Sequence, residues 1–154
     1  MSPKESYTQE QADAKFAFWM EMYNVANTYT NKVIDALKIR DEALAKVEAM
    51  KTSGAKEGKV KKAQEQADLI TSIVTNYEGA FVSTGRTLAE VINMPATILF
   101  KMSFMSGILD HSEGPVTTNM KTEFQLLVEE AKAADSKYLA DIEPELKKFK
   151  KMVE

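Results

Sequence analysis

The feature that most constrains the fold of this chain is an apolar stretch from Val91 to Leu109, VINMPATILFKMSFMSGIL. Lys101 is the only charged residue among these positions. A segment of this composition is favoured only where its surface is removed from water. We therefore expect the amphipathic segments before and after the stretch to pack around it and bury it.

The same stretch is a poor candidate for a membrane span. A transmembrane helix needs about 20 predominantly apolar residues. Lys101 lies near the centre, where a charge costs at least about 2.5 kcal/mol, and Asn93 and Pro95 interrupt the run. These residues argue against a span, and insertion of the 91–109 segment at a lipid surface is kept as the alternative.

Two long segments before the stretch have the periodicity of helices that bury one face. The first is predicted from about residue 12 to 50, and its apolar positions are Phe16, Trp19, Tyr23, Ala26, Val33, Leu37, Leu44 and Val47. The second is predicted from 60 to 91, with a stricter three-four spacing typical of coiled-coil-like packing. Its positions are Val60, Ala63, Ala67, Ile70, Val74, Tyr77, Phe81, Thr84, Leu88 and Val91.

Glycines indicate where the first of these helices ends and where the second could be irregular. Gly54 and Gly58, in the lysine-rich segment 51–62, are expected to end the first helix in a solvated turn. Gly79 and Gly85 lie inside the second predicted helix, where each costs roughly 1 kcal/mol relative to Ala. The apolar pattern persists through both, so one helix with an irregularity near them is the prediction.

Two further helices are predicted after Asn93. The first is short, from about residue 95 to 108, with Asn93 as its N-cap, and is expected to be buried because it is apolar on all sides. The last runs from about 118 to 153 behind a cap at Thr117 or Thr118, and Pro144 is expected to kink or end it. Its apolar positions are Met120, Phe124, Leu127, Ala131, Ala134, Tyr138, Ile142, Leu146, Phe149 and Val153.

These elements predict an all-α protein. The chain has 6 glycines and 4 prolines in 154 residues, and no strand-like alternation of apolar and polar residues occurs between Ala12 and Val153. Long helices joined by short connections favour antiparallel neighbours. We expect a single domain, residues 1–154, that forms an elongated antiparallel four-helix up-down bundle with a short third helix.

Composition excludes several classes of function. The net charge is −3, from 20 basic and 23 acidic residues, so no basic excess points to nucleic acid. The chain has no cysteine, which excludes disulfides, zinc–thiolate sites, iron–sulfur clusters and cysteine nucleophiles. The polar N-terminus predicts no secretory signal in this form of the chain, and the compartment stays open.

The sequence offers few groups for chemistry. His111 is the only histidine, and we interpret it as a solvent-exposed loop residue rather than a metal ligand. The Glu-x-x-His motif of carboxylate-bridged metal bundles is missing. The pairs Asp41/Glu42 and Glu129/Glu130 are adjacent in helices, so their side chains diverge. We therefore assign no catalytic, cofactor-binding or metal-ligating residue, and no cofactor or small-molecule ligand.

Two stretches together resemble a known family. The first is residues 22–47, MYNVANTYTNKVIDALKIRDEALAKV, which contains an Asn/Thr-rich part followed by Ile34, Leu37 and Arg40. The second is residues 93–149, which contains Asn93, Pro95, Pro115, Val116, Thr117, Phe124, Leu127, Asp135, Leu139, Pro144 and Phe149. They resemble the helical C-terminal module of bacterial sortilin-like (VPS10-type) BNR-repeat, glycosyl-hydrolase-like proteins.

The resemblance implies an accessory role. Catalytic residues of such proteins would lie in propeller repeats, which this sequence lacks, so none is carried over. It implies structural support or protein contact, and an extracytoplasmic location.

Three functional hypotheses follow from the residues, and the last of them is a small-molecule or metal-dependent enzyme, which predicts a polar-lined cavity. The first is a non-catalytic helical bundle that packs against a partner domain or a second copy of itself. The second is a membrane- or lipid-interacting bundle that exposes the apolar 91–109 segment.

Overall fold

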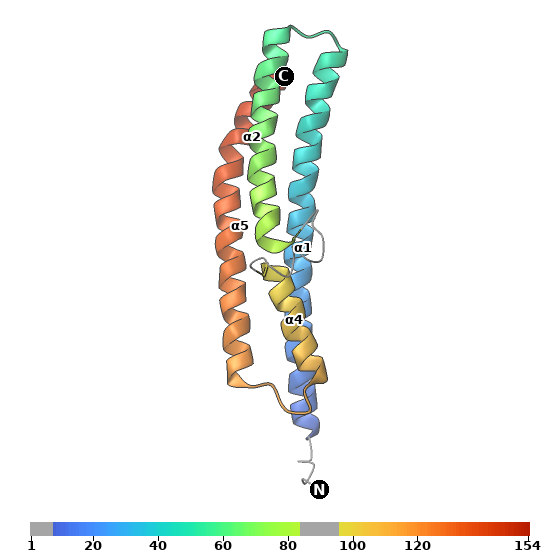
Figure 1. The fold of residues 1–154 in the computed structure, drawn as a ribbon, viewed down its shortest axis with the longest axis vertical. Coiled ribbons are helices and arrows are strands. Elements are labelled where there is room, and N and C mark those ends of the chain that lie inside the picture. The colour runs from blue at the N-terminus through green and yellow to red at the C-terminus, as the bar shows by residue number, and fades with distance from the viewer. Residues whose placement is uncertain (1–7, 84–95) are drawn as a thin grey trace.

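A computed structural model describes residues 8–83 and 96–154, which form an elongated bundle of helices (Figure 1). Within these residues, the predicted all-α class, four helices and short third helix are confirmed, and no strand occurs. The helices are α1 (Gln9–Thr52), α2 (Glu57–Phe81), α4 (Ile98–His111) and α5 (Thr118–Val153).

The first and last helices run in the same direction. Near the start of both helices, Phe18 of α1 packs edge-on against Phe124 of α5, with ring centroids 5.6 Å apart. Further along both, Lys32 of α1 forms an ion pair with Asp135 of α5. Since both contacts advance together along the two helices, α1 and α5 are parallel, and α2 and α4 run opposite to them (Figure 1).

α2 and α4 lie one after the other along the bundle axis rather than side by side (Figure 1). Tyr29, midway along α1, stacks on Phe81 at the end of α2, at a centroid distance of 5.3 Å. Lys15 Nζ, near the start of α1, donates a 2.7 Å hydrogen bond to the carbonyl oxygen of Ser112, just after α4. α2 therefore covers the C-terminal half of α1, and α4 covers the N-terminal half.

The lengths of the helices explain this order. α1 has 44 residues and α2 has 25, so their lengths are about 66 and 37 Å at 1.5 Å per residue. The 14 residues of α4 add about 21 Å, and α2 and α4 together nearly match α1. Because α2 and α4 point in the same direction, the predicted alternation of helix directions is interrupted once. At each level along the bundle axis, three of the described helices lie side by side.

The second helix ends earlier than the predicted boundary at residue 91. α2 stops at Phe81, because Val82 adopts an extended backbone with φ −135° and ψ 147°. The residues that follow in the sequence, Val-Ser-Thr-Gly, are all weak helix formers. Gly79 lies inside α2, while Gly85 and the rest of the predicted helix from residue 84 fall outside the described residues.

Capping side chains fix two of the helix starts. Thr8 caps α1: its hydroxyl accepts a 3.2 Å hydrogen bond from the Gln11 amide, and the Gln11 side chain accepts one from the Thr8 amide. This reciprocal capping box begins α1 three residues before the predicted start. Thr117, one of the two predicted caps, accepts a 3.2 Å hydrogen bond from the Met120 amide at the start of α5.

The other two helix starts also differ from the predicted boundaries. α2 begins at Glu57, three residues before predicted, after a short turn in which Gly54 has a φ of 72°. A left-handed residue of this kind ends helices, as predicted for Gly54. α4 begins at Ile98 behind Thr97, whereas the predicted cap Asn93 and Pro95 lie outside the described residues.

Pro144 does not end α5. The helix is continuous from Thr118 to Val153 with Pro144 inside it. Pro144 removes the N–H that would bond to the carbonyl of Ala140. Both residues are exposed, so water can reach the freed carbonyl and the helix continues.

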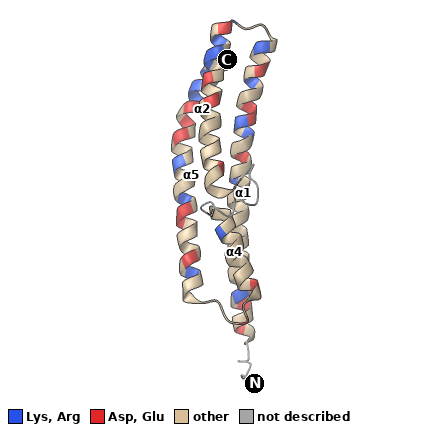
Figure 2. Ribbon diagram, in the orientation of Figure 1, with Lys and Arg blue, Asp and Glu red and all other residues tan. Residues whose placement is uncertain are grey.

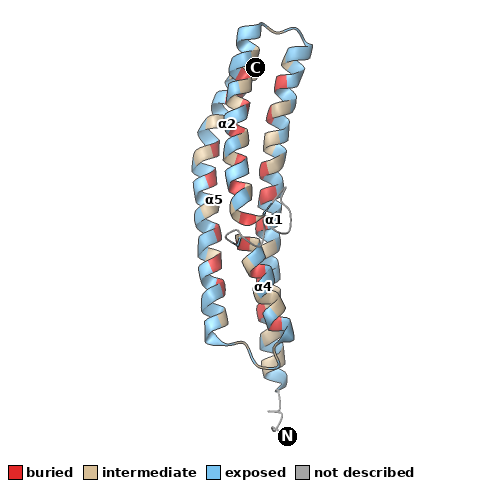
Figure 3. Cartoon of the chain, viewed as in Figure 1, coloured by how far each residue is buried: buried red, intermediate tan, exposed pale blue. Residues whose placement is uncertain are grey.

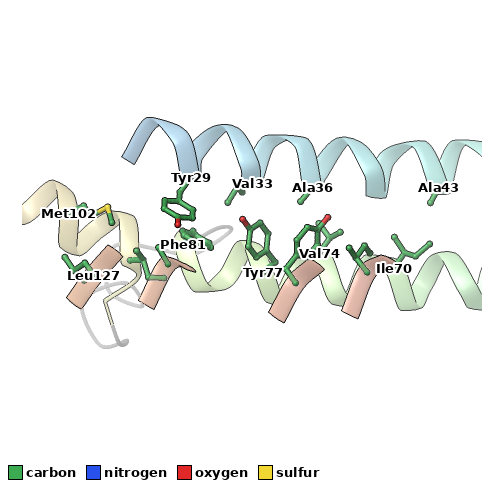
Figure 4. Close-up of a cluster of buried hydrophobic side chains, with 14 of the residues drawn as sticks. Tyr29, Val33, Ala36, Ala43, Ile70, Val74, Tyr77, Phe81, Met102 and Leu127 are labelled. Carbon is green, nitrogen blue, oxygen red and sulfur yellow. The ribbon is translucent and has the colours of Figure 1, made fainter. Parts of the chain in front are cut away.

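The predicted stripes of α2 and α5 face the core (Figure 3). Figure 4 shows part of this core, with Tyr29 lying against Phe81 between α1 and α2. The buried residues of the two helices are Ala63, Ala67, Ile70, Val74, Tyr77, Phe81, Phe124, Leu127, Ala131, Tyr138, Ile142 and Phe149.

Near its N-terminus, α1 buries a different stripe from the predicted one. Phe16 and Tyr23 were expected in the core but are 65% and 54% exposed, whereas Phe18 and Met22 are buried. Nearly every residue from 16 to 23 is apolar, so the spacing alone does not define which line of side chains faces inward. Farther along α1 the predicted stripe is confirmed at Val33 and Val47.

Candidate binding surface

α4 is apolar on two faces, and only one of them is buried. Ile98, Met102 and Leu109 pack into the core, as predicted. Phe100, Phe104 and Ile108 are 55%, 64% and 49% exposed. The prediction that α4 is buried on all sides is therefore wrong for these three residues, which we call the α4 ridge.

The arrangement of the helices explains the exposed ridge. α4 lies against α1 and α5 in the half of the bundle that α2 does not reach (Figure 1). A helix held from two sides buries the side chains that point between its neighbours and leaves the opposite side open. Residues 100, 104 and 108 are four apart, so they line up along one such open side of α4.

A groove of about 650 Å³ runs beside the ridge, between α4 and α5. Lys101 Nζ reaches across from α4 to Glu130 of α5 at 3.2 Å, which connects the two walls. Most side chains that line the groove are apolar, and three are polar. The lining residues are Ala96, Phe100, Lys101, Phe104, Met105, Ile108, Asn119, Met120, Glu123 and Leu127.

A smaller hollow of about 400 Å³ lies on the other side of α4, against α1. Phe16 and Trp19 contribute to its lining together with Leu109. Trp19 stacks on Tyr23 at a centroid distance of 5.7 Å. The exposed aromatic residues near the start of α1 therefore lie on the same half of the molecule as the ridge.

Charge is unevenly distributed along the bundle. Between Ile98 and Leu109, α4 carries only Lys101, and the α1 segment from Met22 to Asn31 carries no charged residue. Blue and red residues are correspondingly sparse on α4 and dense on the half of the bundle that contains α2 (Figure 2). The charge-poor half contains the ridge, which makes it the candidate for contacts with apolar groups.

Polar side chains converge midway along the bundle. The Tyr77 hydroxyl of α2 donates a 2.9 Å hydrogen bond to Asp135 Oδ1 of α5, and Lys32 of α1 pairs with Asp135 Oδ2. Tyr77 also stacks on Tyr138, with ring centroids 4.2 Å apart. We call Lys32, Tyr77, Asp135 and Tyr138 the polar cluster.

Burial controls the protonation of the tyrosines in and beside the polar cluster. Burial, followed by the hydrogen bond to Asp135, raises the pKa of Tyr77 far above its ordinary value. Burial likewise raises the pKa values of Tyr138 and Tyr29. These phenols stay protonated at neutral pH, so they can donate hydrogen bonds but cannot act as general bases.

The other groups considered from the sequence are not brought together. His111 is the last residue of α4 and is exposed. Asp41, Glu42, Glu129 and Glu130 are exposed on α1 and α5. Within residues 8–83 and 96–154, no group of three or more His, Asp or Glu residues is placed to hold a metal ion. Over the same ranges, no helix combines the length and hydrophobicity needed to cross a bilayer.

Comparisons with known proteins gave no relative. Neither the protein-family models, nor the curated proteins, nor the solved structures contain a match to the chain. The candidate surface therefore rests on the geometry of α4 and its neighbours.

Sequence reasoning placed the apolar residues of the ridge on a helix but expected them to be buried. The sequence feature that could have indicated this exposure is the breadth of the apolar surface of the helix. Leu99, Phe100, Phe104 and Ile108 extend it well beyond the line of Ile98 and Met102. A helix with apolar residues on so much of its circumference needs neighbours on every side.

Proposed function

We propose that this protein is a non-catalytic helical bundle that acts by binding another protein chain through the α4 ridge and the adjoining groove. The observation that carries the proposal is the exposure of Phe100, Phe104 and Ile108 on one helix face. Contiguous apolar surface beside a groove is typical of sites where proteins bind one another.

The size of the ridge makes such binding favourable. An aromatic side chain contributes about 150–250 Å² to a buried contact. Phe104, at 64% exposure, therefore leaves roughly 100–160 Å² in contact with water. At about 25 cal/mol per Å², its burial contributes roughly 2.5–4 kcal/mol before the costs of association. Phe100 adds a similar amount, so the ridge has the size of a binding hot spot.

The arrangement of titratable groups supports a non-catalytic role. The convergent groups described above are those of the polar cluster, in which Tyr77 of α2 and Lys32 of α1 bond to Asp135 of α5 and Tyr138 stacks on Tyr77. An accessory role in a larger sortilin-like (VPS10-type) protein, and the extracytoplasmic location that goes with it, stay predictions from the resemblance.

Photo-crosslinking tests the proposal directly. A photo-reactive phenylalanine analogue replaces Phe104 in the protein expressed in its own host. A matched variant carries the analogue at Leu69, an exposed apolar residue of α2. We expect covalent adducts with protein chains at position 104 and far fewer at position 69.

The other outcomes separate the alternatives. Equal labelling at the two positions, or no adduct at position 104, would contradict the proposal. Adducts with lipid alone at position 104 would instead favour the lipid-interacting bundle.

A further inference from the structure

We infer that the end of the bundle at which α1 turns into α2 binds a surface of anionic phospholipid, with the bundle axis upright on that surface. The inference does not depend on the α4 ridge, which lies on the other half of the molecule. Two runs of lysine carry it: six lysines lie between residues 46 and 62, and four lie between 147 and 151. All ten are exposed, and we call them the basic tip.

The fold brings the two runs of lysine together. Gln66 Nε2 of α2 donates a 2.6 Å hydrogen bond to Glu145 Oε2 of α5, so the start of α2 lies beside the end of α5. The turn between α1 and α2 lies at the same end of the bundle (Figure 1). At 1.5 Å per residue, the ten lysines occupy roughly the last 12 Å of the bundle.

The basic tip makes the charge of the molecule strongly asymmetric. Segments 46–62 and 147–154 contain ten lysines and three acidic residues, which gives them a net charge of +7. Since the whole chain has a net charge of −3, the remaining residues carry −10. Blue residues are crowded at this end of the bundle (Figure 2). A negative surface therefore attracts the tip and repels the rest of the molecule.

Helix stability explains only part of the basic tip. The helix dipole stabilises lysines in the last turn of a helix, which accounts for those at the ends of α1 and α5. The same dipole disfavours Lys56 and Lys59, which lie at the start of α2. Of the ten lysines, seven form no ion pair with any of the described residues. The pairs of the other three are Lys51–Glu48, Lys148–Glu145 and Lys150–Glu154.

The composition of the basic tip favours a lipid surface over a protein or a nucleic acid. All ten residues are lysine and none is arginine. Arginine and aromatic residues are enriched in protein interfaces, whereas lysine is depleted there. Aromatic side chains also stack on the bases of single-stranded nucleic acids, and no large hydrophobic side chain of segments 46–62 and 147–154 is exposed. Dispersed lysines suit attraction to many headgroup phosphates, and each one near the surface strengthens binding roughly fivefold.

The shape of the basic tip favours a flat partner. Its lysines come from α1, α2 and α5 and from the turn between the first two. A plane perpendicular to the bundle axis can approach the lysines of all three helices at once, whereas a partner on one side reaches only some of them. In this orientation the acidic remainder points away from the surface, and its repulsion is screened beyond about 8 Å at physiological ionic strength. The α4 ridge then stays free for another partner.

Co-sedimentation of the full chain with vesicles tests the inference. One set of vesicles contains phosphatidylcholine and phosphatidylglycerol in equal parts, and the other contains phosphatidylcholine alone. The tip variant combines Lys59→Gln and Lys151→Gln, and the matched control combines Lys121→Gln and Lys132→Gln, which removes two exposed lysines elsewhere. We expect the unchanged protein and the control to bind the anionic vesicles only. The tip variant should bind them about 25-fold more weakly, with unchanged circular dichroism.

Trp19 reports which part of the bound protein contacts the lipid. It is the only tryptophan and precedes Lys46 by 27 residues, which is about 40 Å along α1. Brominated phosphatidylcholine quenches an indole that enters the acyl-chain region, so the emission of Trp19 should stay unchanged on binding. Strong quenching would show that the half of the bundle containing α4 enters the bilayer, and would overturn upright binding through the tip.

Other results would also overturn the inference. They are a lack of binding to anionic vesicles, equal binding to both kinds of vesicle, and equal loss of affinity in the two variants. Tighter binding to a double-stranded DNA oligonucleotide than to the anionic vesicles would identify nucleic acid as the partner instead. None of these outcomes decides the crosslinking at position 104, because that residue lies on the other half of the bundle.

Discussion

The hydroxyl of Tyr77 in α2 donates a 2.9 Å hydrogen bond to Oδ1 of Asp135 in α5. The second oxygen of the same carboxylate pairs with Lys32 in α1. One largely buried carboxylate thus connects three helices. Because a carboxylate is costly to bury without such partners, these contacts favour a single register of the helices over shifted ones.

The hydrogen bond between Tyr77 and Asp135 leads to a test of stability. Tyr77→Phe keeps the aromatic stacking but removes the donor, and the free energy of unfolding should fall by about 1–3 kcal/mol. Urea unfolding followed by circular dichroism measures the change. Tyr23→Phe is the control, since Tyr23 is exposed, and it should change stability by less than about 0.5 kcal/mol. Equal effects of the two variants would contradict the assigned role of Tyr77.

Alkaline pH should destabilise the protein through the same residue. An unfolded tyrosine ionises near pH 10, whereas burial and Asp135 raise the pKa of folded Tyr77 well above that value. Above about pH 10 the unfolded chain therefore loses a proton that the folded protein keeps, and stability falls as pH rises. Urea midpoints between about pH 8 and 11 should fall less steeply for Tyr77→Phe. Parallel curves for the two proteins would count against this explanation.

The small residues of the α2 stripe should not tolerate larger ones. Ala67 is fully buried, so Ala67→Leu forces additional carbon atoms into a packed core. We expect a loss of about 1–3 kcal/mol in the free energy of unfolding. Ala140→Leu on the exposed side of α5 is the matched control and should change stability by less than about 0.5 kcal/mol. A neutral Ala67→Leu would show that the helices are more loosely packed than described.

Pro144 should lower the free energy of unfolding of the protein. Pro144→Ala restores an N–H for the carbonyl of Ala140 inside α5, so the free energy of unfolding should rise by up to about 3 kcal/mol. Urea denaturation provides the measurement. Pro115→Ala, in the loop before α5, is the control and should not stabilise the protein, because it adds freedom to the unfolded chain. A Pro144→Ala variant that is no more stable than the unchanged protein would contradict the prediction.

Substitutions of phenylalanines in the core and on the ridge should differ in how much they lower the free energy of unfolding. Phe81 is fully buried and stacks on Tyr29, so Phe81→Ala should cost about 3–5 kcal/mol. Phe104→Ala should cost less than about 1 kcal/mol, because the side chain is already largely in water. Both values come from urea unfolding at low protein concentration, where association does not contribute. A large loss for Phe104→Ala would place this residue in the core instead.

The regular parts of the fold were predictable because side-chain burial repeats along a helix. α5 begins and ends at the predicted residues, since Phe124 to Phe149 keep one spacing throughout. The end of α2 was not predictable in this way. The apolar pattern continues to Val91, while the backbone leaves the helix at Val82. Periodicity reports which side chains can share a face, and it does not report where weak helix formers stop the helix.

The sequence predicts which apolar residues make up the candidate surface, but it does not predict that they are exposed. The sequence shows that Phe100, Phe104 and Ile108 lie on an apolar helix, and burial was the reasonable expectation. Their exposure depends on how many helices surround α4, which follows from α2 and α4 sharing the length of α1. That sharing is set by where α2 ends, and a single sequence does not reveal it.

The end-to-end placement of α2 and α4 divides the molecule into two zones of unequal strength. α2 anchors its zone with six buried side chains, whereas α4 anchors the other with three. Detachment of α4 would leave the hairpin of α1 and α2 and its seam with α5 intact, so it costs less free energy than global unfolding. Amide hydrogens of α4 would then exchange with solvent while those of α2 remain protected. The segment that carries the exposed aromatic residues is thus also the part that opens first.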